Sequence, residues 1–244
     1  MEIRICRDAA ALGQSAAAYA AQSLREAISA RGTARLALST GASQFETLAA
    51  LIGQAVDWRR VEAFHLDEYA GIDPRHPASF RKYLRERFVS HVPLKAMHYV
   101  DGTEENRLGL SALLRETEID LGLIGIGENA HIAFNDPPAD FDVEEPYIIV
   151  TLDEACKAQQ CREGWFKALS DVPERAVSMS VRQIMRCRRI VSCVPHGVKA
   201  GAVERTLTTP VSREVPATIL REHPDIELYL DAGSAGKIAP GILW

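Results

Sequence analysis

The residues best suited to chemistry lie in the segment Gly125-Ile-Gly-Glu-Asn-Ala-His131-Ile-Ala-Phe-Asn-Asp136-Pro, directly after an apolar run. An imidazole such as that of His131 can transfer protons near neutral pH. Gly127 permits a tight backbone that comes close to a ligand, and Glu128, Asn129 and Asp136 are near enough in sequence to orient the ring. The segment therefore predicts a proton-transfer site, with a structural histidine as the alternative.

A pair of adjacent carboxylates, Asp67 and Glu68, follows a second apolar run, Val61-Glu-Ala-Phe-His-Leu66. One of them can act as a general base if partial burial brings its pKa towards the working pH, and we place both among the residues expected to meet the substrate. A solvated acidic turn is the alternative. The turn-rich segment 71–80 that follows could fold over a site.

Two further segments favour an anion. The first is a run of small and hydroxyl residues between another apolar run and a predicted helix: Ser39, Thr40, Gly41, Ala42 and Ser43. Exposed backbone amides and the helix N-terminus at such a place attract phosphate. Lys199 lies in the predicted first turn of a helix, a position that is unfavourable for a cation unless an anion offsets the helix dipole. The alternatives are a capped turn without a ligand and an exposed lysine.

Strands and helices alternate along the whole chain. The expected strands are 34–39, 61–66, 97–100, 119–124, 147–152, 189–194 and 226–230, and the expected helices are 8–31, 43–56, 77–88, 104–116 and 197–207. This alternation predicts one α/β domain over residues 1–244, with a mostly parallel sheet and helices on both faces. Ligands of such sheets bind at the carboxyl ends of the strands, which is where the four polar segments fall.

Composition narrows the class of protein. The 244 residues carry a net charge of −5, which gives no electrostatic reason to expect a nucleic acid or a membrane as partner. No apolar run reaches the roughly eighteen residues of a membrane span, and the N-terminus does not resemble a signal peptide. The five cysteines are odd in number and fit no zinc spacing. We therefore expect a cytoplasmic protein with reduced thiols.

The motifs together resemble the glucosamine-6-phosphate deaminase family, also called glucosamine/galactosamine-6-phosphate isomerases. The resemblance extends along nearly the whole chain, through to Lys199, and rests on four segments: Ser39-Thr-Gly-Ala, Phe64-His-Leu-Asp-Glu-Tyr-Ala-Gly71, His76-Pro-Ala-Ser79 and Gly125 to Pro137. The sister family, 6-phosphogluconolactonase, shares the fold but typically has Gly-His-Thr-Ala-Ser where this chain has Ala130-His-Ile-Ala-Phe. The motif at His131 therefore favours the deaminase branch.

The resemblance implies a Rossmann-like fold and a reaction without metal or cofactor. Glucosamine 6-phosphate would become fructose 6-phosphate and ammonia. His131 would open the sugar ring, and Asp67 would move a proton from C2 to C1. The loop Ser39–Ser43 and Lys199 would hold the phosphate. A galactosamine 6-phosphate deaminase, a 6-phosphogluconolactonase and a non-catalytic sugar-phosphate sensor remain as alternatives, in a monomer or a homo-oligomer.

The chain departs from the family pattern at two places, and the position of a third family residue has to be inferred. Asn129 stands where the family commonly has Asp, and an amide can orient an imidazole but cannot stabilise its cation as a carboxylate would. Asp136 stands where the family commonly has Glu, and either Asp136 or Glu128 could supply the lost charge. The family's phosphate-binding arginine lies on the helix after the strand 147–152, where Arg162 is the expected counterpart.

Overall fold

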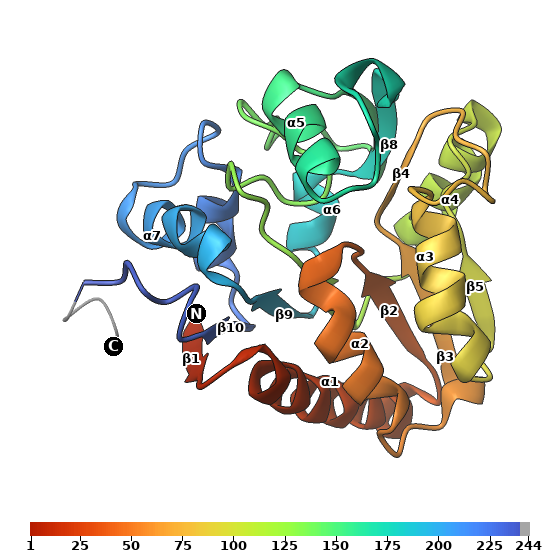
Figure 1. Ribbon diagram of the computed structural model, residues 1–244. Coiled ribbons are helices and arrows are strands. Elements are labelled where there is room, and N and C mark those ends of the chain that lie inside the picture. The colour runs from red at the N-terminus through yellow and green to blue at the C-terminus, as the bar shows by residue number, and fades with distance from the viewer. Residues whose placement is uncertain (240–244) are drawn as a thin grey trace.

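A seven-stranded sheet forms the centre of the molecule (Figure 1). The computed structural model describes residues 1–239. All neighbouring strands of this sheet are parallel. Their order is β1 (Glu2–Cys6), β10 (Ile226–Asp231), β9 (Arg189–Val194), β6 (Leu121–Ile124), β2 (Ala34–Leu38), β3 (Val61–His65) and β5 (Ala96–His98). The expected mostly parallel α/β fold is confirmed.

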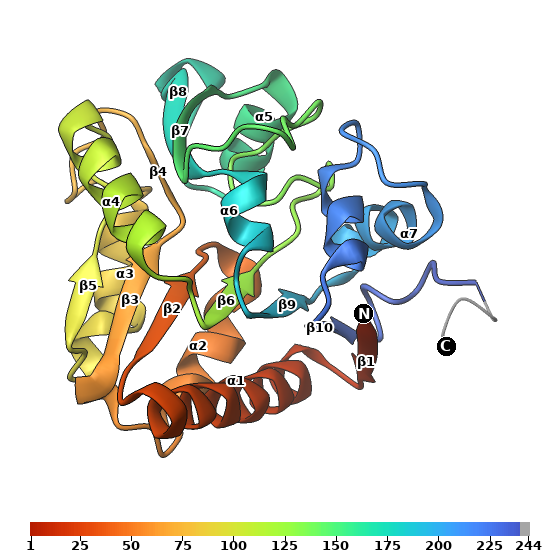
Figure 2. The same ribbon diagram turned by 180° about the vertical axis from the view of Figure 1, so that it is seen from behind.

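Helices cover both faces of this sheet because its inner strands are apolar on both faces. On one face lie α1 (Ala9–Arg31), α2 (Phe45–Ile52) and α3 (Phe80–Arg87); the other face carries α4 (Glu104–Glu116), α6 (Val181–Met185) and α7 (Ala200–Thr208) (Figure 2). Strand β2 shows the alternation: Leu36 and Leu38 enter the core under α1, whereas Ala37 enters the opposite core.

A second, antiparallel sheet of three strands lies beside the carboxyl ends of the large sheet (Figure 1). Its order is β4 (Asp67–Tyr69), β8 (Arg175–Met179) and β7 (Tyr147–Thr151), followed along the chain from β7 by α5 (Glu154–Arg162). Aromatic side chains of a third core join this sheet to α3 and α5, among them Tyr69, Phe80 and Phe134. The small sheet and α5 thereby form the upper wall of the site.

Most expected elements are present, and their ends follow local chemistry. Asp8 caps α1, its side chain accepting from the amide of Ala11 at 2.7 Å, and Gly32 ends that helix with a φ of 79°. Helix 104–116 and strand 189–194 have the expected bounds. The expected helix 43–56 is shorter: a single 3-10 turn precedes α2, which ends at Ile52 before a glycine.

Other elements differ from the expectation. The helix expected from residue 77 begins only at Phe80, because Ser79 accepts from the amide of Lys82 and so caps α3 there. Strands β1 and β8 and helix α6 were not expected. The expected strand 147–152 is present but pairs in the small sheet. In the described residues, no helix is long and apolar enough to cross a membrane.

Close contact between α1 and α2 depends on Gly13, and this leads to a prediction. An added Cβ at Gly13 would come within 2.6 Å of the carbonyl carbon of Glu46, whereas one at Gly109 in α4 would meet nothing within 4 Å. We expect Gly13→Ala to lower the free energy of unfolding by about 1–3 kcal/mol. Gly109→Ala should raise it by up to about 1 kcal/mol through helix propensity alone. Urea unfolding of both variants tests the contact, and equal stabilisation of the two would contradict it.

Candidate active site

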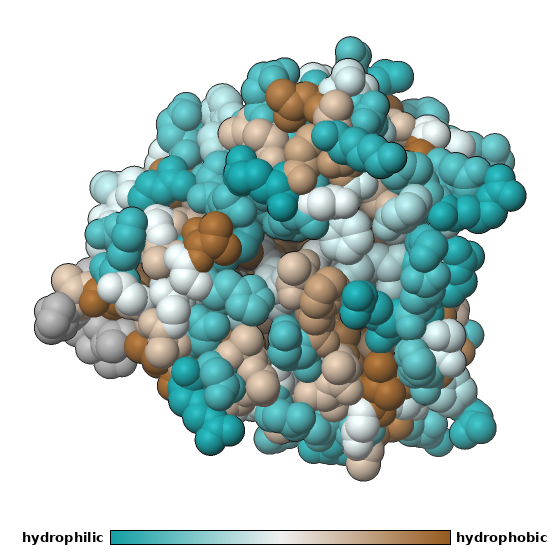
Figure 3. Space-filling view, viewed as in Figure 1, coloured by the Kyte–Doolittle hydropathy of each residue, from teal (hydrophilic) through white to brown (hydrophobic). Residues whose placement is uncertain are grey.

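One cavity collects the segments that follow strands β2, β3, β6 and β9. It is hollowed between α2, α5 and the start of α7 (Figure 3) and has a volume of about 890 Å³ with its open mouth. Among the residues that line it are Ser39, Thr40, Gly41, Ala42, Ser43, Asp67, Gly127, Glu128, His131 and Lys199. Nine of the thirteen residues expected to act in catalysis or binding thus line one cavity. Glu128, which was expected only to orient the imidazole or to supply charge, lines it too.

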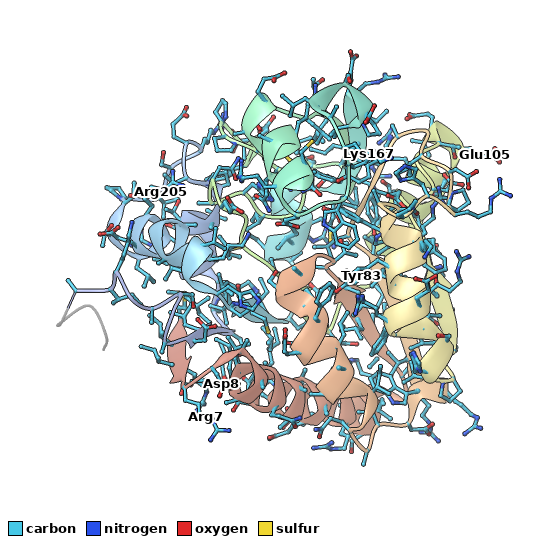
Figure 4. The ribbon with its side chains drawn as sticks, viewed as in Figure 1. Arg7, Asp8, Tyr83, Glu105, Lys167 and Arg205 are labelled. Atoms are coloured by element: carbon cyan, nitrogen blue, oxygen red, sulfur yellow. The ribbon has the colours of Figure 1, made fainter. Side chains whose placement is uncertain are left out.

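The loop Ser39–Ser43 is held from two sides. The amide of Ser39 donates to the carbonyl of Leu123 in β6 at 3.1 Å, and the hydroxyl of Tyr83 donates to the carbonyl of Gly41 at 2.9 Å. Figure 4 shows Tyr83 between α3 and α2. Gly41 has a φ of 94°, which a residue with a Cβ rarely adopts. The loop is therefore held in one conformation, and its small side chains leave room for an anion at its backbone amides.

Lys199 extends into the same cavity from the opposite side. It ends a 3-10 turn, Gly197–Lys199, just before α7, and its side chain is buried, so the alternative of an exposed lysine is wrong. Burial lowers the pKa of its ammonium group, although the carboxylates of Glu163 and Glu128 oppose that effect. A buried ammonium group facing a cavity is a strong attractant for an anionic group of a ligand.

Asp67 is buried where β3 passes into β4, and only 6 % of it is exposed. This burial, together with the charge of the adjacent Glu68, raises the pKa of Asp67 to about 8. The alternative of a solvated acidic turn is therefore wrong. A carboxyl group with this pKa can exchange a proton with a ligand near neutral pH.

Glu68 lies outside the cavity, contrary to the expected contact with substrate. Because it is the next residue in β4, it points to the opposite face of that strand. Its carboxylate accepts from the hydroxyl of Ser79 at 2.7 Å and from the amides of Phe80 and Arg81 at 3.1 and 3.0 Å. Glu68 thus binds the N-terminal turn of α3, where the helix dipole favours a negative charge.

His131 contacts a carboxylate inside the molecule. Its Nδ1 lies 3.0 Å from Oδ1 of Asp136, and both side chains are nearly buried. Burial alone would raise the pKa of Asp136, but the contact with His131 and a hydrogen bond from Asn129 outweigh it and hold that pKa below its usual value. Asp136 therefore faces the imidazole as a carboxylate, and it supplies the negative charge that Asn129 cannot.

Asn129 acts on the loop rather than on the imidazole. Its Nδ2 donates to Oδ1 of Asp136 at 3.2 Å, and its Oδ1 accepts from the backbone amide of His131 at 3.1 Å. Neither Asn129 nor Asp136 lines the cavity. The expectation that the amide binds the ring is not met, because the carboxylate of Asp136 occupies that place.

The backbone around His131 allows few alternatives. Ala130 and Ala133 have φ of 71° and 49°, a region that residues with a Cβ seldom occupy. The amide of Asn135 fixes the turn by donating to the carbonyls of Ile132 and Met179 at 2.8 and 2.9 Å. A Cβ on Gly127 would come within 2.3 Å of the imidazole. The glycine thus makes room for the ring, and the turn holds it in place.

Helix α5 and the turn after it supply cavity residues that the sequence reasoning missed: Gln159, Gln160, Glu163 and Trp165. Glu163 is held by Nε2 of Gln159 at 2.8 Å and by Nε1 of Trp165 at 3.0 Å. Spacings of three and four residues from position 156 to 163 place these side chains on one helix face, which was the available signal. Arg162 is off this face, largely exposed, and bonded to Glu128 at 2.7 Å.

Comparison with known sequences identifies a related family. A family described as glucosamine-6-phosphate isomerases/6-phosphogluconolactonase matches residues 7–228. A glucosamine-6-phosphate deaminase of Staphylococcus epidermidis is 34% identical over 229 residues, which is 89% of this chain and 93% of that protein. The protein of the same name from Lactobacillus delbrueckii subsp. bulgaricus is 29% identical over 98% of this chain and all of its own length.

Solved structures agree with the sequence comparison. A monomeric glucosamine-6-phosphate deaminase superposes with a TM-score of 0.86 at 28% identity, over 97% of this chain and 99% of that one. A 6-phosphogluconolactonase from Shewanella baltica has a TM-score of 0.76 at 18% identity, over 95% and 98% of the two chains, and so shares the fold. This chain belongs to the family of glucosamine-6-phosphate isomerases and 6-phosphogluconolactonases.

Proposed function

We propose that this protein is a glucosamine-6-phosphate deaminase, which converts glucosamine 6-phosphate and water to fructose 6-phosphate and ammonia. The observation that carries the proposal is the meeting of Asp67 and His131 at one cavity that also holds an anion loop and a buried lysine. Two proton-transfer groups and an anion site are what an aldose–ketose isomerisation of a sugar phosphate requires. The relatives that bear this name cover 98% and 89% of the chain.

His131 would act first, on the closed sugar ring. With a proton on Nδ1 facing Asp136, the imidazole presents an unprotonated Nε2. Nε2 takes the proton of the anomeric hydroxyl and delivers it to the ring oxygen, so that the ring opens to the aldehyde. The carboxylate of Asp136 stabilises the imidazolium that forms in between.

Asp67 would act on the open chain. Its carboxylate removes the proton from C2, the electrons of that bond form a double bond between C1 and C2, and the aldehyde oxygen at C1 takes a proton from solvent to give an enolamine. Return of the proton to C1 gives an iminium group at C2. Water adds to C2, and the carbon–nitrogen bond breaks to release ammonia and leave the ketose. The raised pKa of Asp67 suits a group that both takes and returns this proton.

The phosphate would lie between the loop Ser39–Ser43 and Lys199. A dianion there offsets the cost of burying the ammonium group of Lys199. Arg162 stays a proposed phosphate ligand only if it leaves Glu128, because its guanidinium does not line the cavity.

We also propose a cytoplasmic location, which agrees with the five free cysteines, and a monomer, as described for the structural relative.

The activity and its two proton-transfer residues can be tested together. Wild-type protein should release ammonia from glucosamine 6-phosphate. Asp67→Asn and His131→Gln should each lower kcat by about 10²–10⁴-fold, the usual contribution of a general acid–base group. Exposed Arg75→Gln serves as the control and should keep the wild-type rate.

A panel of substrates separates the alternatives. Binding of glucosamine 6-phosphate without release of ammonia would show a sensor instead of an enzyme. Hydrolysis of 6-phosphogluconolactone without deamination would place the protein in the sister branch. A higher kcat/KM for galactosamine 6-phosphate would change the proposed epimer and leave the chemistry in place.

The raised pKa of Asp67 predicts two pH dependences. Because the base must be ionised, kcat/KM should rise with pH to a plateau, with a midpoint near 8. Because the folded state holds this proton and the unfolded state releases it at a lower pH, stability should fall as the pH rises from the usual carboxyl value to about 8. In Asp67→Asn the fall of stability with pH should be smaller. Thermal unfolding of both proteins across this pH range measures the difference. An identical slope in both proteins would refute the assignment.

Gly127 gives a test of the position of the imidazole. The Cβ of Gly127→Ala would overlap His131, so we expect kcat to fall about 10²-fold, as for a reacting group displaced by about 1 Å. Gly109→Ala is the matched control with open space, and its kcat should stay unchanged. A fully active Gly127→Ala enzyme would show that His131 does not need its present position.

A further inference from the structure

Three side chains form a compact group beside the cavity: the imidazole of His131, the carboxylate of Asp136 and the thiol of Cys156. We call them the His–Asp–Cys cluster. One donor atom from each lies within 4.8 Å of the others. We propose that this cluster binds a single divalent cation of the Zn²⁺ type and that the bound ion blocks the reaction by occupying His131.

The donor set fits such an ion. Zn²⁺ is held in proteins by imidazole nitrogen, thiolate sulfur and carboxylate oxygen, and sites with three protein ligands leave a fourth position for water. Tetrahedral coordination with usual bond lengths places donor atoms about 3.3–3.8 Å apart. Nδ1 of His131 and Oδ1 of Asp136 are 3.0 Å apart. Small side-chain movements, of up to about 1 Å, would bring the three donor atoms to this spacing.

An unpartnered polar atom gives an independent reason to expect a ligand here. Within residues 1–239, Oδ2 of Asp136 is buried and has no hydrogen-bond partner, whereas Nδ1 of His131 faces only Oδ1 of the same carboxylate. Asn129 occupies only Oδ1 of Asp136. Buried polar atoms are nearly always satisfied by protein, water or an ion, and a cation would satisfy Oδ2 of Asp136.

The positions of the three residues explain why binding would stop catalysis. His131 and Asp136 lie in the same loop, whereas Cys156 lies in the first turn of α5, which Asp153 caps by accepting from the amide of Cys156 at 2.6 Å. His131 also lines the cavity, which gives the ion a route of entry. A bound ion would hold the imidazole and take its carboxylate partner. This inhibitory consequence rests on the proposed function, whereas the binding site does not.

Proton release accompanies binding. The thiol of Cys156 is buried, and sulfur binds such an ion as the thiolate. The ion replaces the thiol proton with a bond to the thiolate, and the proton leaves to solvent. Metal affinity should therefore increase with pH.

Co²⁺ tests the site without any assay of activity. Titration of reduced, metal-free protein with Co²⁺ should produce a thiolate-to-cobalt charge-transfer band and the visible bands of a tetrahedral ion, and Zn²⁺ should abolish them by displacement. Cys156→Ser should lose the charge-transfer band and bind about 10–100-fold more weakly, by analogy with other lost metal-site interactions. Cys161→Ser is the matched control, since it lies on the same helix outside the cluster, and it should keep the band.

The outcomes separate this inference from the proposed function. An unchanged band in Cys156→Ser, or no band in the wild type, overturns the metal site whatever the enzyme does. If ammonia is released, Zn²⁺ should inhibit the wild type reversibly, with about 10–100-fold weaker inhibition of Cys156→Ser relative to its own metal-free rate. If no ammonia is released but the band forms, the proposed function fails and the site stands.

Discussion

The contact between the imidazole of His131 and the carboxylate of Asp136 is the interaction on which the site depends. It fixes the ring, supplies the charge that an amide at position 129 cannot, and leaves Nε2 for the ligand. Asn129 is a support for this pair, because it binds both the carboxylate and the backbone of the histidine. The carboxylate of Asp136 thus lies against the imidazole, where an amide at position 129 would bring no charge.

The fold places this contact beside other polar groups, because it brings segments that are distant in sequence to the carboxyl edge of the large sheet. Parallel strands end together, so the anion loop after β2, Asp67 after β3, the histidine loop after β6 and Lys199 after β9 face a common cavity. The small antiparallel sheet and α5 close it from above and remove Asp67 from water. Burial, rather than any special neighbour, is the main cause of the perturbed pKa values of Asp67 and Lys199.

Local patterns predicted a large part of this arrangement. Caps at Asp8 and Gly32, apolar runs and strand-end motifs gave the main sheet, most helices and nine cavity-lining residues. The predictions that were wrong concern contacts between residues far apart in sequence. The three residues of β4 pair with β8 more than a hundred residues later, and only that pairing shows that Glu68 points away from the cavity. We expected α5 to contribute through Arg162, which is largely exposed and bonded to Glu128, whereas Gln159 and Gln160 on its polar face line the cavity.

The direct test of the account is the tautomer of His131, read from the couplings of its two ring nitrogens by ¹⁵N NMR in the ligand-free protein. The account predicts a proton on Nδ1, facing Asp136, with Nε2 unprotonated, and a loss of this preference in Asp136→Asn. A proton on Nε2 in the wild type, or the same tautomer in both proteins, would contradict the claim that this carboxylate prepares the imidazole for proton transfer.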